Sequence, residues 1–181
     1  MLVRNVFLLF SLGKRAVHPD PDRLLEQADT LINNHKDETD LRRAMSAAYY
    51  GVFHFILRAA ADLVCGAANR STARYNLVYC GVDHGRLKTL CDQFRGAKPN
   101  DKIKPYLPAG DFAPVADFAR LTLNLQWQRN LADYDTMYNL DTAGAQVAVS
   151  DARDAVKHFQ AASVEQREAF LTLLLFKPRD R

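Results

Sequence analysis

Between Met45 and Leu63, apolar residues recur every three or four positions, a spacing that places them on one side of an α-helix. The stripe consists of Met45, Tyr49, Val52, Ile56, Ala59 and Leu63. Thr39 or Asp40 is a suitable N-cap for this helix, and Gly66 is a suitable terminator. The pattern predicts one long amphipathic helix, the strongest element of the chain.

Helical spacing also recurs before and after this element. We expect a first helix over about Pro21 to Asn34, and a third that starts from the N-cap Asp83 and closes at Gly96. A fourth helix should begin near Phe112. The fifth is marked by Ala148, Ala152, Val156 and Phe159. Residues 67–82 have weak periodicity and predict a loop or a short irregular helix.

The C-terminal segment shows a further start signal, because Ser163 and Gln166 have the spacing of a capping box. No alternating strand pattern of useful length is present. The sequence therefore predicts an all-α fold, an antiparallel bundle of four to five core helices plus a terminal helix. We divide the chain into a basic and apolar lead at 1–20, the helical bundle at 21–162, and a terminal helix with a basic tail at 163–181.

Composition narrows the class of protein. With 181 residues, of which 48% are hydrophobic, the chain can bury a core as one domain without disulfides. The three cysteines form no C-x-x-C pair, which predicts neither a disulfide framework nor a metal site, and favours the cytoplasm. The short apolar run 6–10 lacks the features of a signal peptide, and we expect no membrane anchor. A net charge of +3 permits a polyanionic partner without requiring one.

Three polar side chains on the long helix share a face. Ser46, Tyr50 and His54 are four residues apart, so they form a polar stripe beside the apolar one. Two interpretations remain open. The stripe is either a satisfied network, with a tyrosine hydroxyl bonded to an imidazole, or part of a groove that binds a base or a phosphate.

A second polar group ends the fourth helix, where Arg129, Asn130, Asp133, Tyr134 and Asp135 lie within seven residues. Arg129 and Asp133 have the spacing of an intrahelical ion pair, which is a structural interpretation. The density of hydrogen-bonding groups at the end of a core helix favours a site instead.

His84 follows the cap Asp83, at the start of the third helix. Exposed backbone N–H groups and the helix dipole favour an anion at such a position, so His84 is a candidate phosphate ligand. The alternative is an exposed histidine in a capping region. We assign no role to His18, His35 or His158, and no constellation of ligands for a metal ion or a cofactor is visible.

Taken together, three segments resemble the HEPN family of prokaryotic RNA- and nucleotide-handling proteins. They are Ser46–His54 (SAAYYGVFH), Asp83–Gly85 (DHG) and Arg129–Asp135 (RNLADYD). Their order and spacing both fit the family, and the resemblance covers residues 22–161. It implies an HEPN-type bundle, commonly a homodimer that brings two copies of the late motif into a shared cleft.

The resemblance also implies a function. Some members are metal-independent RNases and toxins, often encoded beside a small nucleotidyltransferase that acts as the antitoxin. Their active motif is an arginine, a polar residue, and a histidine four to six residues beyond the arginine. Arg129 and Asn130 match this motif, but Asp133, Tyr134 and Asp135 stand where the histidine is expected.

We therefore hold three hypotheses. The first is a catalytically weak or inactive HEPN-type module that binds RNA or a nucleotide in a toxin–antitoxin, defence or stress system. Its ligand contacts would come from Ser46, Tyr50, Asn130, Asp133 and Tyr134. The second is an RNA-cleaving toxin in which Arg129 holds the phosphate and His54 or His84 carries the proton. The third is a helical adaptor for other proteins, with a purely structural polar network.

Overall fold

The computed structural model describes residues 18–96 and 98–178, and this part of the chain forms helices without strands. The all-α prediction is confirmed. The α-helices are α1 (Pro21–Asn33), α2 (Glu38–Cys65), α3 (Ala73–Tyr79), α4 (His84–Phe94), α5 (Ala113–Tyr134), α6 (Thr142–Ala161) and α7 (Val164–Leu175). Two 3₁₀ turns, Ala67–Asn69 and Lys104–Tyr106, complete the described elements.

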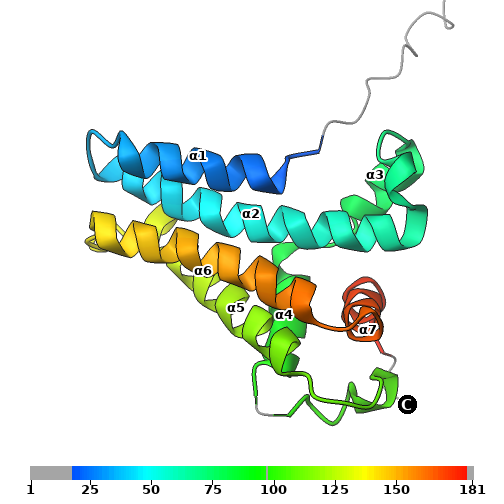
Figure 1. The fold of residues 1–181 in the computed structure, drawn as a ribbon. Coiled ribbons are helices and arrows are strands. Elements are labelled where there is room, and N and C mark those ends of the chain that lie inside the picture. Colours follow the sequence, from blue (N-terminus) through cyan, green and yellow to red (C-terminus); the bar gives the residue numbers. More distant parts are fainter. Residues whose placement is uncertain (1–17, 97, 179–181) are drawn as a thin grey trace, which may run out of the picture.

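The long helix α2 is the centre of the bundle. It packs against α1, α5 and α6, and α1 runs antiparallel to it, as α5 does to α6 (Figure 1). Its N-cap is Asp37, whose carboxylate accepts from the backbone N–H of Thr39, so the prediction of a cap at Thr39 or Asp40 was wrong by two or three residues. Gly66 ends the helix with a φ of 80°, as expected for a terminating glycine.

The predicted apolar stripe of α2 is buried from Met45 to Ile56, but its last residue, Leu63, is not. Leu63 is 41% exposed, whereas Ala60 and Ala61 are buried in its place. Among the described helices, α2 is the one long and apolar enough to cross a membrane by length and composition, but half of that window is buried inside the bundle.

Helices α1 and α2 approach each other closely at Gly51. A Cβ atom at Gly51 would lie 2.7 Å from Cδ2 of Leu25 and 3.4 Å from the carbonyl oxygen of Pro21. Leu25 is itself buried. Glycine at this position therefore lets the side chain of Leu25 lie directly on the backbone of α2.

Replacing Gly51 with alanine should lower the free energy of unfolding by about 1–2 kcal/mol, because overpacking costs more than alanine gains in helix propensity. Urea unfolding followed by circular dichroism measures this change. In a Leu25→Ala background the same substitution should be neutral or stabilising, since the clash is gone. A Gly51→Ala variant as stable as the wild type would contradict close packing of α1 on α2.

Helix α7 belongs to the same core as the bundle. The predicted capping box is present: Ser163 accepts from the N–H of Gln166, and the Gln166 side chain accepts from the N–H of Ser163. Phe170 is fully buried, and its ring centroid lies 5.3 to 5.5 Å from those of Phe94, Phe118 and Phe159. The terminal helix thus joins α4, α5 and α6 through one aromatic cluster.

The segment between α2 and α4 is more ordered than its weak periodicity indicates. Thr72 caps the seven-residue helix α3, whose Tyr75 and Tyr79 are buried. Helix α4 starts as predicted, because the carboxylate of Asp83 accepts from the N–H of Arg86. These two helices bring Tyr79 and His84 against the middle of α2.

Candidate functional site

Three elements meet around Tyr50, in the middle of α2. His84 comes from the first position of α4, and Arg129 comes from the last third of α5. The ring centroid of Tyr50 lies 5.8 Å from that of His84 and 6.1 Å from that of His54. We call Arg129, Tyr50, His54 and His84 the Tyr50 site.

Arg129 is held from several directions. Its Nη2 donates to the Tyr50 hydroxyl at 2.7 Å, and its Nη1 donates to Oδ1 of Asn130 at 3.1 Å. Its Nε lies 2.7 Å from Oδ2 of Asp133, which confirms the predicted intrahelical ion pair. The guanidinium carbon also lies 5.4 Å from the ring centroid of Tyr50 and 5.5 Å from that of Tyr134. The side chain of Arg129 is only 17% exposed, so these contacts enclose most of it.

Ser46 and Asp133 hold the arginine. The Ser46 hydroxyl donates to Oδ1 of Asp133, whose other oxygen faces Arg129. Burial alone would lower the pKa of Arg129, but Asp133 and Tyr50 outweigh it and raise that pKa above its usual value. These contacts fit a positioning role for Ser46 and Asp133, since a carboxylate repels phosphate.

The end of α5 is fixed to α2 by a residue to which we assigned no role from sequence. The guanidinium of Arg42, on the first turns of α2, donates to the carbonyl oxygens of Ala132 at 3.0 Å and Asp135 at 2.9 Å, and also to that of Tyr138. A cation is stabilising at a helix C-terminus, where carbonyl groups lack helical partners. Arg42 therefore keeps Arg129 opposite Tyr50.

His84 is oriented by a tyrosine that the sequence analysis counted as part of the apolar stripe. Its Nδ1 lies 2.8 Å from the buried hydroxyl of Tyr49. Its ring also packs on Phe53, with centroids 3.9 Å apart, and its carbonyl oxygen accepts from the amide of Gln126. Burial raises the pKa of Tyr49, so this hydroxyl keeps its proton at neutral pH.

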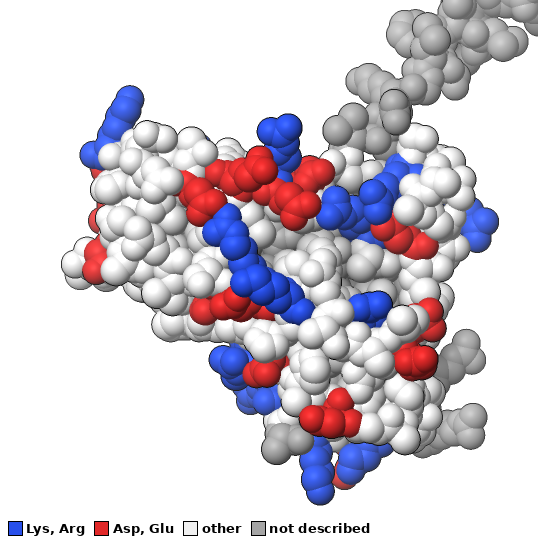
Figure 2. All heavy atoms as spheres, in the orientation of Figure 1, with Lys and Arg blue, Asp and Glu red and all other residues white. Residues whose placement is uncertain are grey.

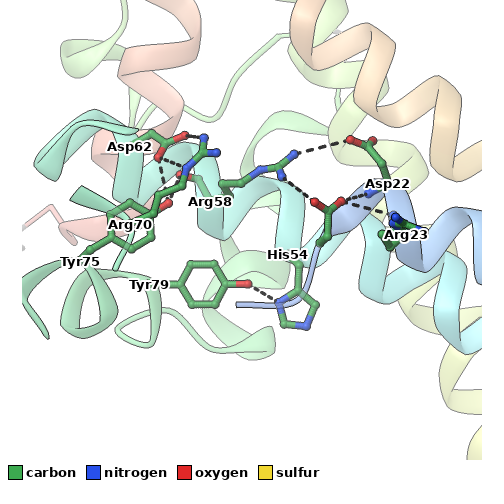
Figure 3. Close-up of polar contacts among 9 residues, drawn as sticks. Asp22, Arg23, His54, Arg58, Asp62, Arg70, Tyr75 and Tyr79 are labelled. Carbon is green, nitrogen blue, oxygen red and sulfur yellow. Dashed lines mark hydrogen bonds and ion pairs between the residues drawn. The ribbon is translucent and has the colours of Figure 1, made fainter. Parts of the chain in front are cut away.

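His54 is likewise oriented by a tyrosine hydroxyl, in this case from another helix. Its Nδ1 lies 2.7 Å from the hydroxyl of Tyr79 on α3, as Figure 3 shows. The ring of His18 lies on the other side of Tyr79, with centroids 4.1 Å apart. Among the described residues, Nε2 of His54 and Nε2 of His84 have no hydrogen-bond partner. Both nitrogens are therefore free to bond a ligand.

The surroundings of both histidines favour the neutral imidazole. Burial lowers the pKa of His84, and the positive charge of Arg129 lowers it further. Burial also lowers the pKa of His54, with smaller effects from His84 and His18. An anion that binds among these groups would oppose the effect of Arg129 on His84, because a negative charge favours the charged imidazole.

A second polar cluster lies further along α2 (Figure 3). Asp62 accepts from the guanidinium of Arg70 and, at 2.9 Å, from the hydroxyl of Tyr75. Burial alone would raise the pKa of Asp62, but the hydrogen bonds from Arg70 and Tyr75 hold it below the usual value. The carboxylate of Asp62 accepts from both donors, Arg70 and Tyr75. This cluster therefore has a structural role, in which it holds α3 against α2.

The two predicted polar groups do come together, but not by the expected bonds. Tyr50 does not hydrogen-bond to His54; its hydroxyl accepts from Arg129, and the hydroxyl bonded to His54 belongs to Tyr79. Asn130 and Tyr134 lie at the outer edge of the site, where Tyr134 is 73% exposed. Tyr49, Tyr79 and Arg42 were missed as site residues. The described residues contain no group of three or more histidine, cysteine, aspartate or glutamate side chains that could hold a metal ion.

In comparisons with known proteins, no family model matches the chain, and no curated protein or solved structure matches it either.

Proposed function

We propose that the chain is an HEPN-type module that binds RNA or a nucleotide by a phosphate group at the Tyr50 site. The observation that carries this proposal is the convergence of Arg129, His54 and His84 from three segments of the chain around one tyrosine. Each histidine is fixed through Nδ1 and presents Nε2. The resemblance to the HEPN family was drawn from the same residues.

The donors left at the site suit a phosphate. A guanidinium has five N–H groups, so Nη1 and Nη2 of Arg129 each retain one after bonding Asn130 and Tyr50. Arginine binds phosphate oxygens with a planar pair of donors. If the Tyr49 hydroxyl donates to Nδ1 of His84, Nε2 of that ring carries the proton and adds a third donor.

The face that carries α1, α2 and α6 offers little continuous positive charge to a polyanion. On the face that carries α1, α2 and α6, basic side chains lie beside acidic ones rather than in a continuous patch (Figure 2). Ion pairs such as Arg153 with Asp29 and Lys157 with Asp154 belong to α1 and α6. The Tyr50 site, between α2, α4 and α5, is therefore the better candidate for an RNA contact.

The direct test is binding of labelled total RNA and of single nucleotides by the purified wild type, with EDTA present. Binding that weakens as salt is added supports phosphate recognition. A well-folded protein with no affinity for RNA or nucleotides would contradict the proposal and favour the helical adaptor. A partner nucleotidyltransferase and a homodimer remain predictions from the resemblance, testable by co-purification and sedimentation.

A second candidate function is metal-independent cleavage of RNA, and one observation favours it. Two histidines and an arginine lie around Tyr50, and this reaction uses the same kinds of group. One imidazole, in its neutral form, can accept the proton of the attacking 2'-hydroxyl; the other, in its protonated form, can donate a proton to the departing 5'-oxygen; and Arg129 can stabilise charge on the phosphate. A relocated histidine would thus replace the one absent from the late motif.

If His84 is the base and the other ring the acid, cleavage should fall at high pH, where the acid has lost its proton. At lower pH, cleavage should rise with pH through the pKa of His84, because only the neutral ring accepts a proton. The midpoint should lie below the usual histidine value of 6.5, since burial and Arg129 lower the pKa of His84. Binding should show the opposite trend and tighten as pH falls, because protonation adds positive charge. Rates and affinities from about pH 5 to 8 measure both.

His84→Gln should abolish that pH-dependent cleavage. The matched control is His158→Gln on α6, which should leave the pH profile of the wild type unchanged. Cleavage that persists unchanged in His84→Gln and His54→Gln would exclude both rings as proton carriers.

A further inference from the structure

Two large aromatic side chains lie exposed on one side of α5, and the second of them lies against Arg129 of the Tyr50 site. Trp127 is 58% exposed and Tyr134 is 73% exposed. They are seven residues apart, which places them on one side of the helix and about 10 Å apart along its axis. Exposed aromatics also occur elsewhere, at Tyr106 and Phe176, so the distinguishing feature of this pair is its shared side of one helix.

Their surroundings are polar, and the two carboxylates nearest in sequence are Asp133, which pairs with Arg129, and Asp135. From Phe118 to Ala132, α5 carries no aspartate or glutamate, but two arginines and four amides, namely Arg120, Asn124, Gln126, Gln128, Arg129 and Asn130. Asn130 lies between the two aromatics along the helix and is exposed. Amides and guanidinium groups hydrogen-bond the edges of nucleic-acid bases.

Tyr134 connects this face to the phosphate position. Its ring centroid lies 5.5 Å from the guanidinium carbon of Arg129, whose Nη2 bonds Tyr50 inside the site. A strand with one phosphate at Arg129 would therefore have its neighbouring bases beside the exposed rings. Aromatic platforms next to a cation are the usual means of binding unpaired bases.

We propose that Trp127 and Tyr134 stack on unpaired bases of an RNA strand whose phosphate is bound at Arg129. This inference rests on the proposed function and names its substrate as single-stranded. Bases inside a duplex stack on one another, so they cannot stack on protein side chains such as Trp127 and Tyr134.

The chain provides its own probe, because Trp127 is its single tryptophan. A short single-stranded RNA with a fluorescent label reports binding by anisotropy, while tryptophan emission reports contact with Trp127. We expect the bound strand to quench that emission, and a hairpin that pairs the same bases to leave it nearly unchanged. Trp127→Ala and Tyr134→Ala should each weaken binding by about five- to a hundredfold.

Two controls separate stacking from other effects. Trp127→Phe keeps a ring and should retain most of the affinity, whereas Tyr106→Ala removes an aromatic that is 52% exposed elsewhere and should change nothing. Circular dichroism checks that each variant is folded. We expect folding to be retained, because the substituted residues are exposed.

The outcomes are distinguishable. If the wild type binds RNA by anisotropy but tryptophan emission and Trp127→Ala show no effect, stacking is wrong and the Tyr50 proposal stands. If no RNA binds, both proposals fail. If emission instead depends on protein concentration, and Trp127→Ala turns a dimer into a monomer without affecting RNA, this face is an interface between copies and the inference is overturned.

Discussion

Replacing Phe170 with alanine should lower the free energy of unfolding by about 3–5 kcal/mol, the usual cost of deleting a buried phenyl ring. Phe170 is fully buried at the contact of α7 with α4, α5 and α6, where three other rings surround it. The cavity would open in the middle of that cluster and could not close without moving a helix. Urea unfolding measures the loss. The dependence of the unfolding free energy on urea concentration should stay unchanged.

The matched control is Phe176→Ala. Phe176 follows α7 directly and is 65% exposed, so its removal should change stability by less than about 0.5 kcal/mol. Equal effects of the two substitutions would show that α7 is not part of the core. A two-step transition in Phe170→Ala would show that α7 unfolds on its own.

Replacing Arg129 with alanine should weaken RNA binding about thirtyfold, equivalent to about 2 kcal/mol for a charged hydrogen-bonding partner. The loss has two causes. The phosphate loses its planar donors, and Asp133 loses the cation that neutralises it, so its carboxylate repels the ligand. The slope of log affinity against log salt should also fall by about 0.7, the value for one phosphate contact on a single strand.

Two further variants test whether the effect is specific. Arg129→Lys keeps the charge without the planar donor pair, so its affinity should lie between those of wild type and alanine variant. Arg95→Ala removes the same charge from an exposed position at the far end of α4, roughly 16 Å along that helix from His84. If Arg129→Ala and Arg95→Ala lose equal affinity, the contribution of Arg129 is only general charge.

Helix positions and caps were largely predictable, because they depend on local signals. The periodicity of α2, the cap Asp83 and the box formed by Ser163 and Gln166 are all encoded within a few residues. The position of Leu63 was not predictable in this way. Its spacing continues the stripe, but the helices that cover α2 do not extend over that side of its last turn.

The site was predictable as a set of residues and not as a network. Spacing along α2 and α5 placed Ser46 with Tyr50 and Arg129 with Asp133, each four residues apart. The bonds between these pairs join residues about eighty positions apart, and no local pattern encodes them.

Tyr49 illustrates the same limit for a single residue. A tyrosine in an apolar stripe counts as a core residue, and its ring is indeed buried. Only the position of α4 shows that its hydroxyl meets His84.

The pairing of each histidine with its own tyrosine has an evolutionary consequence. A buried hydroxyl without a partner costs stability, and an imidazole without that hydroxyl loses its fixed orientation, so neither member of a pair is useful alone. In descendants of this sequence, phenylalanine at position 49 should accompany loss of His84, and phenylalanine at position 79 should accompany loss of His54. The two pairs use different helices, so one can be lost while the other is inherited intact.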